Sequence, residues 1–237
     1  NMIYDQICAA KSKGEKLLAI LIDPDHLSLE SLPELMTSVN ESPATHIMVG
    51  GSLIQKNEMD KYLSIIKGLT NLPVILFPGN YAQISKQADG ILFLSLISGR
   101  NPEYLIGQHI HAAPLIKQTH LEVLPTGYVL IDSGAPTSVS YISNTQPIPR
   151  NKKDIALATA LAGEMLGLKM IYLEAGSGAQ FPVPTETIRL VSSSLKIPII
   201  VGGGMRTPEA IQEAYEAGAD MVVVGTAFEK NIHFFKK

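Results

Sequence analysis

Two glycine-bearing segments near the end of the chain have the composition of an anion-binding site. Gly203 and Gly204 follow one short apolar run, and Gly225 and Thr226 follow the next. Glycine lets the backbone approach an anion closely and adopt positive φ, and amides at a helix start can then donate to that anion. We expect a phosphate site where these segments meet, with the Thr226 hydroxyl as a further donor. Glycines that merely permit tight turns are the alternative.

A third segment, YLEAGSGA, combines a carboxylate with flexible, donor-rich chain. Tyr172 and Glu174 alternate along an apolar run, so they share one side of a strand. A glutamate among apolar residues is costly unless it binds something, and it could orient a hydroxyl or accept its proton. Gly176, Ser177 and Gly178 would extend the phosphate site. A structural salt bridge of Glu174 across the sheet is the alternative.

A possible metal site lies at the ends of two earlier apolar runs. Asp23 ends the first run and is followed by Pro24, and Ser52 lies in VGGS at the end of the second. One carboxylate and one hydroxyl, completed by waters or phosphate oxygens, suit Mg²⁺. The Ser52 hydroxyl suits the cap of a following helix equally well, so the spacing leaves both interpretations open.

The remaining polar candidates carry weaker signals. His109 and His111 are two residues apart and do not share a helix face, so we expect both to be solvated. Cys8 is the one cysteine of the chain, which excludes an internal disulfide and a thiolate zinc cluster and suits the cytoplasm.

The elements that must position these residues follow from the apolar pattern. Eight short, continuously apolar runs alternate with amphipathic segments, as in parallel strands buried on both faces. The runs span 17–24, 46–51, 73–79, 90–99, 122–132, 170–176, 198–204 and 221–227. This order favours a (β/α)8 barrel over a doubly wound open sheet, because no GxGxxG follows the first run. Active sites of such barrels lie at the carboxyl ends of the strands, where all the segments above fall.

Three connections have distinctive sequences. Thr207 and Pro208 predict a helix N-cap and first turn. The segment 80–89 predicts no strong helix. The long, polar segment 133–150 is either functional or a surface excursion.

Composition bounds the class of protein. The chain has 237 residues, of which 46% are hydrophobic and 17% charged, with a formal net charge of −3. These values predict a soluble protein with a single domain over 1–237 and give no reason to expect a nucleic-acid partner. No apolar run reaches the length of about 18 residues that a membrane span requires.

Taken together, the motifs resemble the geranylgeranylglyceryl phosphate synthase family, which includes the bacterial heptaprenylglyceryl phosphate synthases. The resemblance runs from about residue 15 to the end of the chain, and the longer, archaeal-type branch found in some bacteria fits better than the shorter one. It rests on LIDPDH, VGGS, FPGN, SLISGRNPEYLIG, PTGYVLID, YLEAGSGA, VGGGMRTPEA and ADMVVVGTAFE.

The resemblance implies a fold and a reaction. The fold is a modified (β/α)8 TIM barrel whose third helix is irregular or missing. The reaction is Mg²⁺-dependent transfer of a polyprenyl group, with geranylgeranyl as the expected chain, from its diphosphate to the C3 hydroxyl of sn-glycerol 1-phosphate. The product is an ether lipid precursor. The family also implies a homo-oligomer, either a dimer or a hexamer, and a hydrophobic trench that the motifs do not locate.

The resemblance also implies residue roles. Asp23 and Ser52 would carry the magnesium, Glu174 would accept the hydroxyl proton, and Tyr172 would orient the glycerol. The residues implied to hold glycerol 1-phosphate are Tyr172, Leu173, Glu174, Ala175, Gly176, Ser177, Gly178, Gly203, Gly204, Gly225 and Thr226.

The sequence differs from the family pattern at one position and leaves two alternative functions open. Related sequences often have lysine after DPD, where this chain has His26, so a diphosphate contact there would be weaker or pH-dependent. The rivals are another phosphate-binding barrel enzyme, such as an isomerase or aldolase, and a non-catalytic barrel that binds phosphate or lipid. A Schiff-base aldolase needs a lysine at the end of a strand, and the sequence has none there, which counts against an aldolase of this type.

Overall fold

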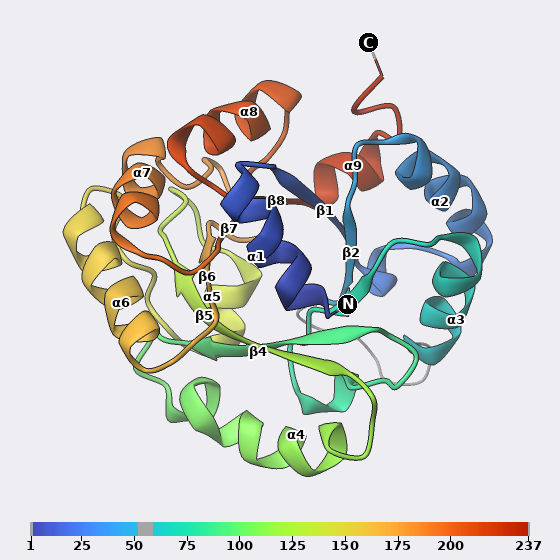
Figure 1. Cartoon of the computed structure of the whole chain (residues 1–237), viewed down its shortest axis with the longest axis horizontal. Helices are drawn as coiled ribbons and strands as arrows, with labels where there is room; N and C mark the ends of the chain where they lie inside the picture. The colour runs from blue at the N-terminus through green and yellow to red at the C-terminus, as the bar shows by residue number, and fades with distance from the viewer. Residues whose placement is uncertain (1, 52–58, 237) are drawn as a thin grey trace.

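Eight parallel strands close into a barrel in chain order, and β8 pairs back onto β1 (Figure 1). The computed structural model describes residues 2–51 and 59–236. The strands are β1 (Leu17–Ile22), β2 (His46–Val49), β3 (Val74–Leu76), β4 (Gly90–Leu96), β5 (Glu122–Leu130), β6 (Met170–Glu174), β7 (Ile199–Gly202) and β8 (Met221–Val224). The predicted barrel is confirmed, and the open doubly wound sheet is excluded.

Among the residues that the structure describes, seven helices surround the barrel and bury the outer faces of its strands (Figure 1). They are α2 (Leu32–Glu41), α3 (Met59–Leu69), α4 (Gln108–Ile116), α6 (Lys153–Met165), α7 (Thr185–Ser194), α8 (Pro208–Ala217) and α9 (Thr226–Lys230). The helices α1 (Ile3–Lys13) and α5 (Ser138–Ser143) lie at the ends of the barrel. The predicted N-cap of α8 is confirmed, because the Thr207 hydroxyl accepts the Ala210 N–H at 3.1 Å. Over residues 2–51 and 59–236, no helix is both long and apolar enough to cross a membrane.

The connection between β3 and β4 has no α-helix. It contains a single 3₁₀ turn, η3 (Tyr81–Gln83), which confirms the prediction that the third helix is irregular or missing. The strand β3 is three residues long and pairs with β4 at Gly90 and Ile91. The upper part of β4 therefore lacks a strand neighbour on this side, and the space that a helix would fill stays available.

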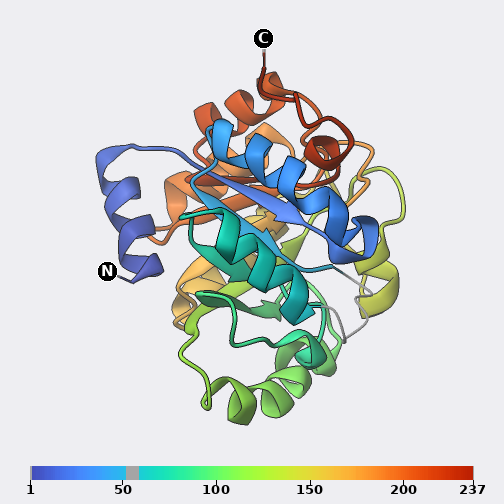
Figure 2. The same ribbon diagram turned by 90° about the vertical axis from the view of Figure 1, so that its right-hand side faces the viewer.

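The helix α1 closes the amino-terminal end of the barrel. Its residues Ile3, Ile7 and Ala10 pack against the side chains inside the barrel. The Glu122 carboxylate, at the start of β5, accepts the N–H groups of Ile3 and Tyr4 at 2.5 and 3.0 Å and so satisfies the free amides of the first turn. Figure 2 places α1 on one side of the barrel and α5, in yellow-green, on the opposite side. Since α1 blocks one end, ligands must enter at the other.

Candidate functional site

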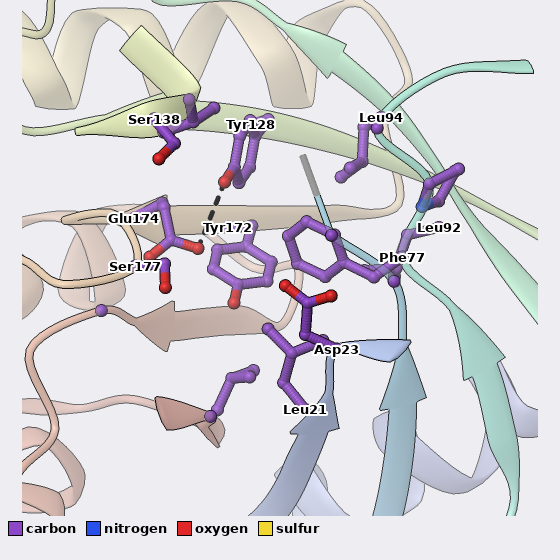
Figure 3. Close-up of a pocket in the computed structure, with 18 of the residues that line it drawn as sticks. Leu21, Asp23, Phe77, Leu92, Leu94, Tyr128, Ser138, Tyr172, Glu174 and Ser177 are labelled. Carbon is purple, nitrogen blue, oxygen red and sulfur yellow. Dashed lines mark hydrogen bonds between the residues drawn. The ribbon is translucent and has the colours of Figure 1, made fainter. Parts of the chain in front are cut away.

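A cavity of about 700 Å³ opens at the carboxyl ends of the strands. Its lining residues come from most of the strand ends and from α4, α5 and α9. Figure 3 shows the carboxylates of Glu174 and Asp23 approaching this space from different strands, with the Tyr172 ring between them. The structure therefore places Asp23, Tyr172 and Glu174, which separate sequence motifs contribute, around one cavity.

Glu174 is a buried carboxylate that ends β6 and points into the cavity. It is 6% exposed, and its carboxylate accepts the Tyr128 hydroxyl at 3.2 Å and the Gly176 N–H at 2.9 Å (Figure 3). Burial raises the pKa of Glu174, and hydrogen bonds from Gly176, Tyr128 and Tyr172 oppose that rise. Such a carboxyl group is suited to accept a proton from a hydroxyl beside it. Among residues 2–51 and 59–236, the hydrogen-bond donors to Glu174 carry no charge, which contradicts the alternative of a structural salt bridge across the sheet.

Two tyrosines and a phenylalanine form an aromatic cluster beside Glu174. The rings of Tyr128 and Tyr172 meet edge to face with centroids 5.3 Å apart, and Phe77 contacts them at 5.9 and 5.5 Å. Burial raises the pKa of both tyrosines well above 10, and the Glu174 charge raises it further, so both remain neutral. Sequence reasoning missed Tyr128. The alternation along β5, which places Tyr128 inside the barrel with Leu124 and Leu130, could have revealed it.

The glycine segments converge on the same carboxylate. Gly203 and Gly204 have φ of +87° and +71°, a region that disfavours other residues. A Cβ at Gly203 would lie 2.6 Å from Glu174 Oε1 and 2.6 Å from the Gly176 N. Glycine is therefore required here both for conformation and for the close approach of two loops. Gly178, with φ of +73°, lines the cavity together with Ser177.

The other residues predicted to hold glycerol phosphate differ in position. Leu173 and Ala175 are buried in the core outside the barrel, so their side chains do not line the cavity. Gly225 lines it with an ordinary φ of −120°, and a Cβ there would only touch Leu21 at 3.5 Å. The helix α9 begins at Thr226, whose side chain lies outside the described part of the structure.

Asp23 forms a second acidic corner across the cavity mouth. Its side chain accepts the Asp25 N–H at 2.9 Å, and its own N–H donates to Glu229 Oε1 at 2.9 Å. His26 Nε2 lies 3.4 Å from Asp23 Oδ2. Burial raises the pKa of both Asp23 and Glu229. Sequence reasoning missed Glu229, although it ends the GTAFE motif and lies one turn into α9.

The acidic corner suits a cation shared with a ligand better than a closed metal site. A Cβ at Gly51 would meet Asp23 Oδ2 at 2.6 Å, so the end of β2 packs directly on the carboxylate. The described residues contain no group of three or more acidic, His or Cys ligands that could hold a metal alone. Mg²⁺ commonly takes one or two carboxylates and completes its shell with waters and phosphate oxygens. Ser52, the other predicted ligand, lies outside the described residues.

An apolar trench continues the cavity away from these polar corners. It runs between β4 and α4, where the missing third helix leaves space. Its lining residues include Ile84, Ile91, Leu92, Phe93, Leu94, Tyr104, Ala112 and Ile116. The segment 133–150 forms α5, and Ser138, Val139 and Ile142 add to the cavity wall, so it is more than a surface excursion.

The prediction that His109 is solvated is wrong. This side chain is 9% exposed and faces the trench, where its Nε2 lies 2.6 Å from the Leu94 carbonyl oxygen. Its ring also packs edge to face on Phe93, with centroids 4.8 Å apart. The prediction used only the spacing of His109 and His111 along an isolated helix. That spacing carries no information about β4, whose free edge lies beside α4. His111 is exposed, as predicted.

Comparisons with known proteins agree with this architecture. A sequence model of the PcrB family matches residues 11–236. The chain is 56% identical over 233 residues to a geranylgeranylglyceryl phosphate synthase of Flavobacterium johnsoniae, covering 98% of this chain and 96% of the relative. It is 44% identical to the protein of the same name from Korarchaeum cryptofilum, over 92% of this chain and 90% of the relative.

A solved structure is similar over the whole chain. The (S)-3-O-geranylgeranylglyceryl phosphate synthase of Thermoplasma acidophilum, in complex with its substrate sn-glycerol-1-phosphate, superposes with a TM-score of 0.94 at 35% identity. The match covers 100% of this chain and 95% of that one.

Proposed function

The chain belongs to the PcrB family, and from this premise we propose that it is a geranylgeranylglyceryl phosphate synthase. It transfers a geranylgeranyl group from its diphosphate to the C3 hydroxyl of sn-glycerol 1-phosphate and forms an ether lipid precursor. The main support for this function is the position of Glu174, a buried carboxylate that lies between a glycine-rich corner and an apolar trench. The reaction joins a phosphorylated polyol to a hydrocarbon, and these two regions meet at Glu174.

The glycine corner is the site proposed for glycerol 1-phosphate. The backbone turns at Gly203, Gly204 and Gly178 have positive φ and surround a carboxylate that already accepts one backbone N–H. Amides of such turns donate to a phosphate, and Arg206, which lines the cavity, adds positive charge. Glycerol phosphate fixed there would present its far hydroxyl to Glu174, with Tyr172 orienting it.

The trench is the site proposed for the prenyl chain. Its wall is formed by aliphatic and aromatic side chains of β4 and α4, which a hydrocarbon covers without leaving polar groups unpaired. A small sugar phosphate would leave this half of the cavity unfilled. The alternative of an isomerase or aldolase therefore accounts for one half of the site, whereas prenyl transfer accounts for both.

The bond changes follow from this arrangement. A new bond forms between the glycerol C3 oxygen and carbon 1 of the prenyl group. The bond between carbon 1 and the diphosphate oxygen breaks, and its electron pair leaves with the diphosphate. The hydroxyl proton passes to Glu174, which must be ionised to accept it. Holding both substrates at reacting distance supplies a large part of the acceleration.

Asp23 is the proposed magnesium ligand. The residues present fit Mg²⁺, because the carboxylates of Asp23 and Glu229 lie together at the mouth and leave room for phosphate oxygens. Bound magnesium would neutralise the leaving diphosphate. Glu229 holds the backbone of Asp23 through its N–H and so positions the carboxylate. His26, whose Nε2 lies 3.4 Å from Asp23 Oδ2, occupies the position where the family resemblance predicts lysine.

Two further properties stay predictions. We expect the protein to act in the cytoplasm. We also expect a homo-oligomer, either a dimer or a hexamer. Size-exclusion chromatography with light scattering would decide between these assemblies.

A transfer assay tests the proposed function. Purified protein, magnesium and radiolabelled sn-glycerol 1-phosphate are incubated with C15, C20 and C25 polyprenyl diphosphates, and the organic-soluble product is counted. We expect product with the C20 substrate and none with sn-glycerol 3-phosphate, the mirror-image control. Binding of both substrates without product from any chain would favour the non-catalytic barrel and overturn the proposal.

A further inference from the structure

His109 has one satisfied and one unsatisfied ring nitrogen. Its Nε2 lies 2.6 Å from the Leu94 carbonyl oxygen. A carbonyl only accepts, so this bond places the proton of the neutral imidazole on Nε2 and leaves a lone pair on Nδ1. That Nδ1 is buried and has no hydrogen-bond partner among the described residues. The side chain itself is 91% buried, as its 9% exposure shows, and it lines the trench.

A second unsatisfied acceptor belongs to the next residue. Gln108 also lines the trench, and its Oε1 is buried without a partner in the part of the chain that the structure describes. Gln108 begins α4 directly after the π-helical segment η4 (Glu103–Gly107). A single π-helical turn within a helix often occurs at a functional site. Here Gln108 and His109 both reach the same apolar space.

Two buried acceptors in an apolar wall need a donor. Leaving such a group unpaired is destabilising, and a hydrocarbon chain has no donor to offer. A water molecule has two O–H donors and can be retained in a buried place that has polar partners. The trench does not end at this level, since Ala112 and Ile116 line it one and two turns further along α4. Packing alone therefore does not close the trench here.

We propose that His109 Nδ1 and Gln108 Oε1 form a specificity-determining polar point in the trench wall, which holds a donor such as water and disfavours prenyl chains long enough to cover it. This inference rests on the proposed function. A chain that stops short of the polar point leaves its donor in place. A chain that extends over it displaces the donor and leaves both acceptors unpaired, so its binding weakens although space remains beyond.

The test compares chain lengths in two variants. Gln108→Met removes one acceptor at similar length and leaves the bond to Leu94 intact, and His109→Phe removes the other. The measured quantity is kcat/KM for C15, C20 and C25 diphosphates. We expect each variant to raise the efficiency with the longest chain relative to the shortest by about fivefold or more, since 1 kcal/mol corresponds to that factor. Gln118→Met, at an exposed site after α4, is the matched control and should leave the ratio unchanged.

A spectroscopic measurement separates this effect from a loss of structure. The ¹⁵N resonances of the His109 ring should show a protonated Nε2 and a hydrogen-bonded, unprotonated Nδ1. Binding of a non-hydrolysable C25 analogue should shift the Nδ1 resonance more than binding of the C15 analogue. An unchanged chain-length ratio in both folded variants, with active protein, would overturn the inference. Absence of product from the unmodified protein with every chain would instead overturn the proposed function.

Discussion

The two ends of the barrel use the same residue types for opposite purposes. At the amino-terminal end, Asp220 accepts the Ile199 N–H at 2.9 Å and the Lys11 ammonium at 3.0 Å. Glu122 accepts two amides of α1 in the same manner. These carboxylates are paired by the chain itself, and each bond ties α1 or a strand start in place. Their charges stabilise the fold.

At the carboxyl-terminal end, the carboxylates of Glu174 and Asp23 face the cavity and remain able to bind a ligand. Burial raises the pKa of Glu174 and of Asp23, and both line the cavity. Among the described residues, their hydrogen-bond donors are a tyrosine hydroxyl and backbone amides, and a largely exposed histidine lies beside Asp23. Such charges cost stability and are retained where a ligand uses them. The contrast distinguishes structural from functional acids without reference to any relative.

Replacing Glu174 by Gln gives the largest expected effect. The variant keeps the shape of the side chain and loses the proton acceptor, so kcat should fall by about 10³-fold. Its stability should not fall. The folded-state pKa of Glu174 is raised, so the stability linked to its proton is present at low pH and lost as pH rises through that pKa. A neutral amide avoids that loss, and the Tyr128 hydroxyl can accept from it. Transfer assays and thermal unfolding at two pH values check both statements.

Glu122→Gln is the matched control for this variant. It changes the same residue type at the opposite end, where the carboxylate holds α1. We expect lower stability and nearly unchanged turnover. Near-normal activity of Glu174→Gln would remove Glu174 from the mechanism.

Replacing Asp23 by Asn should give the next largest effect. The carboxylate is the proposed magnesium ligand, and an amide oxygen binds Mg²⁺ more weakly, so the magnesium concentration for half-maximal rate should rise by about tenfold to a hundredfold. Mn²⁺ binding, measured by electron paramagnetic resonance with the diphosphate substrate present, gives a readout independent of turnover. An unchanged metal response in both measurements would refute this site.

Replacing Asp220 by Asn should affect stability alone. The Ile199 N–H and Lys11 would lose a charged acceptor, which costs about 1.5–3 kcal/mol of unfolding free energy. Turnover should stay unchanged, because Asp220 lies at the end of the barrel that α1 closes and ligands enter at the other end. Urea denaturation and kcat/KM together test the variant. A large fall in kcat/KM with native stability would break the distinction between the two ends.

Much of the fold could be predicted from the sequence because local signals agreed with one another. Continuous apolar runs gave the buried parallel strands, and Thr207 with Pro208 gave a helix start that the structure confirms. The irregular connection after β3 was also predicted, since 80–89 lacks a helical pattern. The site segments were predicted for the same reason: each follows a strand, and strand ends of a barrel meet at one mouth.

The parts that could not be predicted depend on contacts between distant segments. Tyr128 bonds to Glu174, 46 positions away, and Glu229 bonds to Asp23, 206 positions away. No local sequence pattern predicts such pairs. His109 was wrongly expected in solvent because its partner is a carbonyl on the open edge of β4. Leu173 shared a motif with Glu174, but the alternation of a strand turns its side chain away from the cavity.

Replacing Tyr128 by Phe should give the smallest effect and the finest test of the contrast. The hydroxyl donates to Glu174 Oε2 at 3.2 Å, and this bond lowers the pKa of Glu174 against the larger effect of burial. Without it the pKa rises further, less of the base is ionised at a given pH, and the acid limb of the kcat profile moves to higher pH. The loss of one hydrogen bond, about 1 kcal/mol, limits the change to several-fold. Tyr4→Phe is the control at the other end, where the hydroxyl donates to the Lys169 carbonyl at 3.1 Å. It removes the same group from a structural bond, so its pH profile should match that of the unmodified protein. An unshifted profile in Tyr128→Phe would mean that this hydroxyl does not tune the base, and an equal shift in Tyr4→Phe would mean that the shift does not come from the bond to Glu174.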